Sequence, residues 1–244
     1  MKILALDSSG LVASVAVVED DILVAEYTMN YKKTHSQTLL PMLDQVKKAI
    51  SLDLNSIDAI AVAAGPGSFT GLRIGSATAK GLGLALDKPL IGVPTVDALA
   101  YNLYDTAPDT LICPIMDARR NQVYTGIYRF EKEFETVHGQ DVMDMGNLIH
   151  ILNGLGEPVI LLGDGVPVYE KQIEKNMSAP FRFAPAHANR QRAAAVAALG
   201  AVYFKEGKVE TADEHGPDYL RKSQAERERE AREQAAAKKE GAEC

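Results

Sequence analysis

The chain has 244 residues, of which 46% are hydrophobic and 24% are charged, and its formal net charge is -7. This length is enough for two lobes with separate cores, and the composition is ordinary for a globular protein. The acidic balance argues against a protein that grips a nucleic-acid backbone unaided, because such proteins present a basic surface.

The first segment predicts a meander of three strands. Short apolar runs at residues 3–7, 13–18 and 22–28 are separated by turn residues. A helix is predicted next, beginning near Thr38 so that Pro41 falls in its first turn. Apolar residues recur along one side of this helix at spacings of four, three and four. They are Leu39, Leu43, Val46 and Ile50.

A glycine-rich loop at residues 65–73 follows a wholly apolar strand at residues 59–64 and precedes a helix that ends near Leu86. The loop has neither the P-loop spacing nor the Rossmann dinucleotide pattern. Small residues recur every four positions along the helix; they are Gly71, Gly75, Ala79 and Gly83. Glycine inside a helix costs about 1 kcal/mol relative to alanine. The stripe therefore indicates close packing against this backbone, either by the sheet of the same chain or by a partner subunit.

A second strand-rich unit is predicted beyond a candidate lobe boundary at Pro108-Asp109. A strand at 90–93 and a helix at 97–104 are expected before this boundary. The elements expected beyond it are a hairpin of 111–116 and 122–130, a helix at 147–155, a strand at 159–162 and an alanine-rich helix at 190–205. From Lys222 on, acidic and basic residues alternate without an apolar stripe, as in a solvated helix or a disordered tail. We divide the chain into a first lobe at 1–107, a second lobe at 108–188, a helix and return segment between the lobes at 189–221, and a charged tail at 222–244.

Both units begin with a strand that runs into an acidic turn. The turn is Asp7-Ser8-Ser9 in the first unit and Asp117-Ala118-Arg119 in the second. This echo fits a duplicated meander fold, in which such turns hold nucleotide phosphates and an aspartate binds a metal. On the residues alone, the favoured role of Asp7 is a turn residue that bonds its own backbone.

Metal, disulfide and membrane chemistry are not predicted. The five histidines show no helical i, i+3 or i+4 pair, and no cysteine joins them. Cys113 and Cys244 imply no disulfide framework. No apolar run is long enough to span a bilayer, and the first residues are interrupted by charge too soon for a secretory signal. We expect a cytoplasmic protein with no cofactor and no membrane contact.

Several stretches together resemble the TsaB (YeaZ) family. They are residues 3–9, Thr34-His35-Ser36-Gln37 leading to Leu40-Pro41, residues 65–75, Val93-Pro94-Thr95, Asp117-Ala118-Arg119 and Pro217-Asp218-Tyr219-Leu220-Arg221. The resemblance spans residues 1 to about 221, and residues 65–75 are its most specific part. It implies a two-lobed actin/Hsp70-like (ASKHA) α/β fold, with a duplicated mixed β-sheet flanked by helices.

The resemblance also implies a role in making N6-threonylcarbamoyladenosine at position 37 of tRNAs that read ANN codons. In that family TsaB pairs with a catalytic paralogue, TsaD, and the ATPase TsaE docks on the pair. The resemblance thus implies that this chain contacts tRNA only indirectly, through the complex. TsaB also pairs with itself through first-lobe helices, which would put both helical stripes at a partner interface. Those residues are Leu39, Leu43, Val46, Ile50, Gly71, Gly75, Ala79 and Gly83.

One departure from the catalytic paralogue bears on activity. TsaD carries a His-x-x-x-His metal motif, and the corresponding positions here are Thr95 and Leu99. Leucine offers no donor atom, so the resemblance implies a pseudo-enzyme subunit without catalytic residues or a metal. A residual nucleotide cleft would be lined by Asp7, Ser8, Gly163, Asp164 and Gly165.

Two other functions stay open. An independent actin-like nucleotide hydrolase or kinase would use Asp7 and Asp164 as metal-side carboxylates. A peptidase is the third hypothesis, and the missing histidine pair argues against it. Magnesium-dependent ATP binding that depends on Asp7 would separate the first of these from a non-catalytic subunit.

Overall fold

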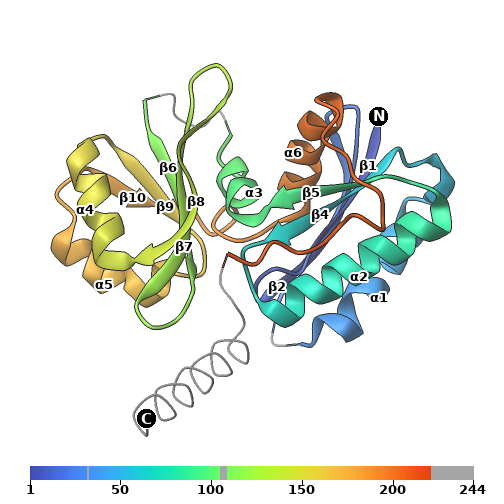
Figure 1. The fold of residues 1–244 in the computed structure, drawn as a ribbon, viewed down its shortest axis with the longest axis horizontal. Helices are drawn as coiled ribbons and strands as arrows, with labels where there is room; N and C mark the ends of the chain where they lie inside the picture. The colour runs from blue at the N-terminus through green and yellow to red at the C-terminus, as the bar shows by residue number, and fades with distance from the viewer. Residues whose placement is uncertain (32, 105–108, 221–244) are drawn as a thin grey trace, which may run out of the picture.

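The computed structural model describes residues 1–31, 33–104 and 109–220. The predicted charged tail at 222–244 and the predicted lobe boundary near Pro108 lie outside these ranges. Two five-stranded sheets stand side by side, and helices flank each of them (Figure 1). This arrangement confirms the predicted two-lobed, actin-like α/β fold.

The first sheet has the strand order β3-β2-β1-β4-β5 and the second has the order β10-β9-β6-β7-β8. The first comprises β1 (Lys2–Asp7), β2 (Val12–Glu19), β3 (Ile22–Asn30), β4 (Ala59–Gly65) and β5 (Leu90–Pro94). The second comprises β6 (Leu111–Asp117), β7 (Gln122–Phe130), β8 (Phe134–Asp144), β9 (Val159–Leu162) and β10 (Phe181–Phe183). β1 pairs antiparallel with β2 and parallel with β4, and β6 pairs in the same way with β7 and β9. The second sheet therefore repeats the topology of the first.

The helices follow the strands in the same order in both halves. They are α1 (His35–Ala49), α2 (Phe69–Leu86) and α3 (Thr95–Tyr101), then α4 (Met145–Leu155), α5 (Val166–Asn176) and α6 (Ala193–Lys205), with a short 3₁₀ helix, η1 (Leu54–Ser56), after α1. The predicted start of α1 near Thr38 was wrong. The helix begins at His35 and carries Pro41 inside it, on an exposed position. β8, α5 and β10 are elements that the sequence pattern did not predict.

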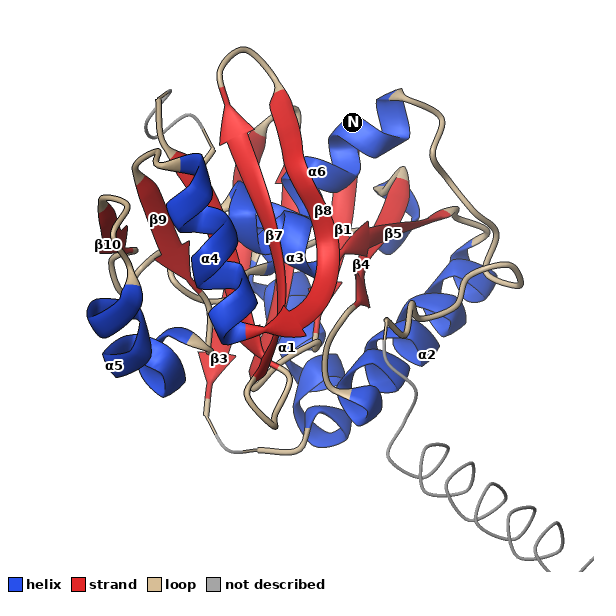
Figure 2. Cartoon of the chain, turned by 60° about the vertical axis from the view of Figure 1, so that its left-hand side comes forward, coloured by secondary structure: helices blue, strands red, loops and turns tan. Residues whose placement is uncertain are grey.

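The first lobe has a core on each face of its sheet, because successive side chains of a strand point to opposite faces. Leu4 and Leu6 of β1 pack with α1 and α2, whereas Ile3 and Ala5 pack with α6. The second sheet is built in the same way. One face packs with α4 and α5, which stand in front of it in Figure 2, and the other packs with α3.

The last helix of each half ties the two lobes together. α6 follows the second sheet in the chain but packs on β1 and β2 of the first sheet. α3 follows the first sheet and contacts β6 and β7 of the second. α3 and α6 also contact each other, so the junction between the lobes contains a helix from each half.

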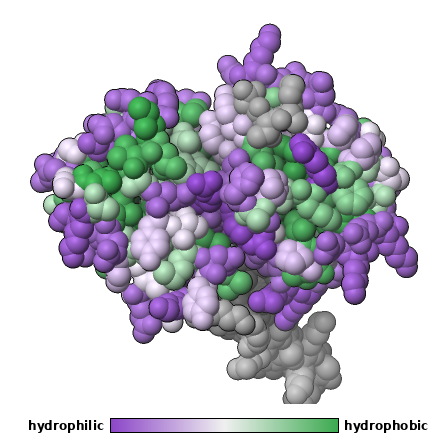
Figure 3. Space-filling view, turned by 180° about the vertical axis from the view of Figure 1, so that it is seen from behind, coloured by the Kyte–Doolittle hydropathy of each residue, from purple (hydrophilic) through white to green (hydrophobic). Residues whose placement is uncertain are grey.

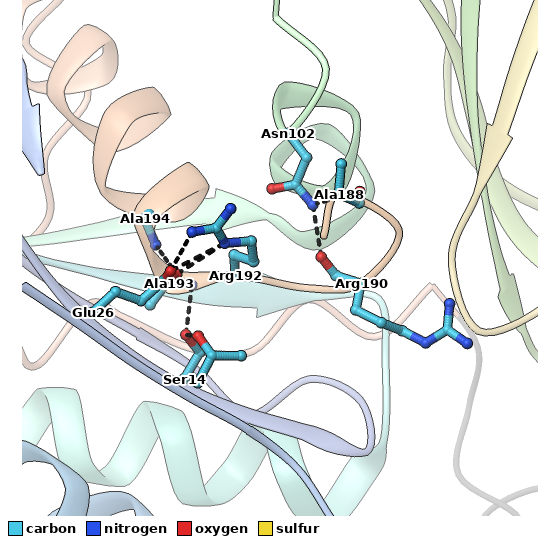
Figure 4. A network of polar contacts seen from close by, with 9 residues as sticks. Ser14, Glu26, Asn102, Ala188, Arg190, Arg192, Ala193 and Ala194 are labelled. Carbon is cyan, nitrogen blue, oxygen red and sulfur yellow. Dashed lines mark hydrogen bonds and ion pairs between the residues drawn. The ribbon is translucent and has the colours of Figure 1, made fainter. Parts of the chain in front are cut away.

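The segment that crosses from the second lobe to α6 is fixed by hydrogen bonds to its main chain (Figure 4). The Asn102 side-chain amide, just after α3, donates to the main-chain oxygens of Ala188 at 3.2 Å and Arg190 at 2.6 Å. These bonds hold the crossing segment against the end of α3.

The start of α6 is anchored on β2 and β3. The Arg192 Nε donates to Glu26 Oε2 at 3.0 Å, and the amide of Ala194 donates to Glu26 Oε1 at 3.2 Å. The amide of Ala193 donates to Ser14 Oγ at 2.9 Å (Figure 4). Free amides at a helix start need such acceptors, so Glu26 serves both as a cap and as a counter-ion.

After α6 the chain returns along the first lobe. The amide of Asp218 donates to the main-chain oxygen of Ala64 at 2.7 Å, and the rings of Tyr219 and Phe69 lie 5.1 Å apart. The Gln140 Nε2 of β8 donates to Asp218 Oδ2 at 3.0 Å. The return segment thus holds the start of α2 and touches the second lobe.

The outer surface is mixed in character. Seen from behind, hydrophobic areas on both lobes are separated by hydrophilic residues along the middle of the molecule (Figure 3). In the described ranges, no helix has the length and apolar content needed to cross a membrane.

Replacing Glu26 by alanine removes the partner of Arg192 and the cap of α6. We expect the free energy of unfolding to fall by about 1–3 kcal/mol, because hydrogen-bonding groups are left without an acceptor. Chemical denaturation measures this change. Asp44→Ala breaks an exposed ion pair with Lys48 and is the control, with an expected change below about 0.5 kcal/mol. Equal effects of the two substitutions would contradict the anchoring role of Glu26.

Candidate functional site

A cavity of about 300 Å³ opens between the lobes, beside the turns that follow β1, β4, β6 and β9. Its lining residues are Ser9, Gly10, Leu11, Gly67 and Ser68 from the first lobe, and Met116, Asp117, Ala118, Arg119, Tyr124 and Asp164 from the second. The parallel pairs β1–β4 and β6–β9 end together, which brings these distant segments to one place. The cavity is therefore lined by equivalent turns of the two repeated sheets.

The two acidic turns have the same local geometry. Asp7 Oδ1 accepts hydrogen bonds from the amide of Ser9 at 2.9 Å and from its hydroxyl at 2.6 Å. Asp117 Oδ1 accepts one from the amide of Arg119 at 2.9 Å. Both are side-chain-to-backbone turns that aspartate forms readily. Asp7 thus has the turn role that its residue type favoured.

Asp7 lies beneath the cavity rather than in its wall. Its side chain is buried, and burial raises the pKa of this carboxyl group, although the hydrogen bonds from Ser9 oppose the shift. The neighbouring Ser8 hydroxyl donates to the main-chain oxygen of Gly71 at 2.9 Å. Neither Asp7 nor Ser8 is among the residues that line this cavity, and Ser8 packs against the start of α2.

Asp164 is one of the residues that line the cavity. Its Oδ1 accepts a hydrogen bond from the amide of Asp117 at 3.3 Å. Burial raises the pKa of the Asp164 carboxyl group, with Asp117's amide and the charge of Arg190 acting against it. Gly163 and Gly165 instead serve packing. Each lies against the main-chain oxygen of Ile115, and Gly163 has a φ of +112° that other residues rarely adopt.

Asp117 and Arg119 are cavity residues that the sequence analysis named only as part of a turn. The Arg119 Nη1 lies 3.4 Å from Asp117 Oδ2, so an exposed guanidinium stands beside this carboxylate. Among the residues with a described position, no group of three or more His, Cys, Asp or Glu side chains could hold a metal ion. The wall offers hydroxyls, main-chain amides, two carboxylates and one guanidinium to a small polar ligand.

The two residues of α3 that the sequence resemblance aligned with the paralogue's histidine pair are buried. Thr95 and Leu99 have 0% and 1% of their surface exposed. Leu99 packs in the core shared with β6 and β7, and the Thr95 hydroxyl has no hydrogen-bond partner. Both side chains fill the junction between the lobes and neither lines the cavity.

A covalent nucleophile is not assembled at the cavity. The Ser9 hydroxyl donates to Asp7 and the Ser8 hydroxyl to Gly71, and within the described chain neither bonds a histidine. Cys113 is buried in β6, and burial raises the pKa of its thiol to about 12. A thiol with that pKa is protonated at neutral pH and is a poor nucleophile.

The two helical stripes pack inside the first lobe. Leu39, Leu43 and Val46 are at most 5% exposed in the core beneath α1, and Ile50 packs against this core. On α2, a side chain at Gly71 or Gly75 would collide with Ser8, Ala79 lies in the core, and one at Gly83 would collide with Leu90. All of these residues except Ile50 are thus buried within the first lobe itself. The close neighbour of the stripe is the sheet of the same chain.

The opposite faces of α1 and α2 are exposed. Leu40 of α1 is 54% exposed and Leu84 of α2 is 64% exposed. Between them in sequence, Ala77 and Gly81 are exposed small residues of α2, and a side chain at Gly81 would meet no neighbouring atom. The exposed side of α2 thus carries small and apolar residues that the described chain leaves uncovered.

The repeated sheet and the polar cavity between the repeats define an actin-like two-lobed protein. A family model described as TsaD, tRNA N6-adenosine threonylcarbamoyltransferase, matches residues 23–229. The tRNA threonylcarbamoyladenosine biosynthesis protein TsaB of Bacillus subtilis is 36% identical over 230 residues, covering 93% of this chain and 96% of that protein. The chain belongs to the TsaB (YeaZ) family of tRNA threonylcarbamoyladenosine biosynthesis proteins, within this wider TsaD group.

Solved structures agree with this assignment. A Pseudomonas aeruginosa protein described as similar to peptidase YeaZ has a TM-score of 0.76 at 25% identity, covering 90% of this chain and 99% of that one. YeaZ from Pseudomonas aeruginosa has a TM-score of 0.74 at 24% identity, covering 89% and 99% of the two chains, and supports the fold.

A leucine at Gly75 must displace Ser8, because a side-chain carbon there would lie 2.6 Å from the Ser8 hydroxyl oxygen. We expect Gly75→Leu to lower the free energy of unfolding by about 1–3 kcal/mol or more. Gly81→Ala, on the exposed face of the same helix, should raise it by up to about 1 kcal/mol. Urea unfolding followed by circular dichroism measures both. A Gly75→Leu variant as stable as the native chain would contradict the close packing of α2.

The raised pKa of Asp7 predicts a pH-dependent stability. The folded-state pKa exceeds the ordinary value of 3.8, so ionisation costs stability. The cost is absent below that value and grows as pH rises to the folded pKa. Asp7→Asn keeps an oxygen acceptor for Ser9 without the charge. Near about pH 7 the variant should therefore have the higher free energy of unfolding, with a difference that vanishes toward about pH 4.

Denaturant titrations across this pH range test the prediction. Asp44→Asn, on an exposed position of α1, is the control for loss of one carboxylate. A native chain that is more stable than Asp7→Asn near neutral pH would mean that the Asp7 carboxylate has a stabilising charge partner.

Proposed function

We propose that this chain is a non-catalytic subunit that supports a TsaD-like catalytic subunit in N6-threonylcarbamoylation of adenosine 37 in tRNAs that read ANN codons. Family membership supports the pathway. The non-catalytic assignment is carried by α3, where Thr95 and Leu99 occupy the positions of the paralogue's metal histidines and are buried in the core. Leucine has no donor atom for a metal, and neither side chain reaches the cavity.

The proposed partner surface is the exposed face of α1 and α2, around Leu40, Ala77, Gly81 and Leu84. Small residues there let the backbone of another helix approach closely, and the exposed leucines give apolar area to bury. The TsaD family model matches this chain across both helices, so a TsaD-like subunit carries the equivalent pair. The same face then suits a homodimer and a heterodimer, which would compete for it.

The remaining partners follow from the same complex. We propose that a TsaE-like ATPase docks on the pair and that tRNA is reached through the complex. The net charge of -7 supports a minor role for this chain in holding the RNA backbone.

Co-purification with the TsaD-like paralogue from the same cell, with mass determination and a tRNA modification assay, tests the function. A stable pair and modification that requires both chains is the expected result. Modification without this chain would overturn the proposal. Magnesium-dependent ATP binding at micromolar affinity, lost in Asp164→Asn, would instead favour an independent nucleotide hydrolase or kinase.

The helix face has its own test. Leu84→Asp places a charge where the partner helix would desolvate it, so the affinity of the pair should fall at least about 10-fold. Val168→Asp is the matched control, because Val168 of α5 is also exposed, at 57%, and lies on the second lobe. Light scattering after size-exclusion chromatography measures the mass of the pair. A pair that survives Leu84→Asp unchanged would show that another surface is used.

A further inference from the structure

A second cavity, of about 450 Å³, lies between α3, α6 and the start of β8. It shares no residue with the cleft that Asp117 and Asp164 line. Its volume falls in the range of small-molecule sites in proteins. The function proposed above does not use it.

Four aromatic rings line this second cavity. They belong to Tyr101, Tyr104, Phe134 and Tyr203. The ring centroids of Tyr101 and Tyr104 are 4.9 Å apart, and those of Tyr101 and Phe134 are 5.6 Å apart in an edge-to-face arrangement. An aromatic face carries partial negative charge and attracts cations.

One ring face already holds a cation of the chain itself. The Lys208 Nζ lies 4.8 Å from the Tyr203 ring centroid, and it also lies 2.7 Å from Glu206 Oε2. Both residues line the cavity. The cavity wall therefore accommodates an alkylammonium group over Tyr203, and a ligand of like charge would compete with Lys208.

A carboxylate in the wall has room for a further partner. Asp97, in the first turn of α3, is half-buried in the wall of the cavity. The Tyr128 hydroxyl donates to its Oδ1 at 2.5 Å, while the Tyr203 hydroxyl reaches its Oδ2 only at 3.5 Å. Within the described ranges no lysine, arginine or histidine pairs with this carboxylate. Oδ2 thus keeps acceptor capacity.

Burial raises the pKa of Asp97, and the two tyrosine hydroxyls act against that shift. Desolvation of this kind is relieved when a cation binds, because buried charges are normally paired. The free acceptor capacity of Asp97 Oδ2 and the buried negative charge of this carboxylate therefore both favour a cationic ligand.

We propose that this second cavity binds an organic cation of the alkylguanidinium or alkylammonium class, with Asp97 as its counter-ion and the rings of Tyr101, Tyr104 and Tyr203 around it. A guanidinium group suits it best, since its plane stacks on aromatic rings and its edge matches a carboxylate. Tyr203 belongs to α6, which packs on the first sheet, whereas Phe134 belongs to the second. A bound cation would therefore bridge the two lobes.

Isothermal titration calorimetry of the full chain with agmatine tests the site, and N-butylurea is the uncharged comparison. Agmatine should bind saturably with a Kd in the millimolar range or tighter. Asp97→Asn should weaken binding at least about 10-fold, and Lys208→Met should tighten it about 3-fold by removing the resident cation. Asp213→Asn, an exposed carboxylate outside the cavity, should leave the affinity unchanged.

Spermidine and the peptide Gly-Arg-Gly distinguish the source of the cation. Tighter binding of the peptide indicates an arginine side chain of another protein, and tighter binding of agmatine or spermidine indicates a free amine. Absence of saturable binding by all three overturns the proposal, as does equal binding of N-butylurea. Should Asp97→Asn fail to fold, Lys208→Met decides, and an unchanged affinity there overturns it. The tRNA modification assay is independent of each outcome.

Discussion

The close approach of α2 to the turn after β1 is the contact on which the first lobe depends. Main-chain oxygens of Ser8 and Ser9 lie where side chains would stand at Gly71 and Gly67. No other residue fits at these positions without moving the helix off the sheet. Asp7, which begins this turn, is buried and accepts its hydrogen bonds from Ser9 of the same turn.

This contact also decides which surface of the first lobe is free. A stripe of glycine and alanine turned inward brings α2 close to the sheet, and α2 and α1 then lie together against it. The outward face of α2 carries a second set of small residues, Ala77 and Gly81, which no part of the described chain requires for packing. Glycine at an exposed helical position costs stability, so a role outside the monomer is the simplest physical reason for Gly81.

Much of the fold could be predicted because its buried strands are apolar and short. Nearly all residues of β1, β4 and β9 are buried. A continuous apolar run in the sequence indicates a strand of this kind. β8 was not predicted because it is a sheet-edge strand with no buried residue, so its sequence lacks a continuous apolar run. α5 was not predicted because only two of its residues, Tyr169 and Ile173, are buried. Two residues are too few to give a recognisable apolar periodicity in the sequence.

The site was harder to predict for a geometric reason. A stripe of small residues is the same signal whether its neighbour belongs to the same chain or to another, and only the structure shows Ser8 beside Gly75. Asp164 could be named from its turn, but the second cavity could not. Its rings come from residues 101, 104, 134 and 203. These residues meet because α3 contacts the second sheet and α6 packs on the first sheet.

α3 presents a buried side and a polar side. Thr95 and Leu99 are four residues apart and share a face, which is buried between the lobes. Asp97 lies between them in sequence and therefore points to the other side, where it lines the second cavity. Thr95 and Leu99 therefore contribute to the junction between the lobes, while Asp97 remains in the wall of the second cavity. The helix is thus structural on one side and still polar and ligand-accessible on the other.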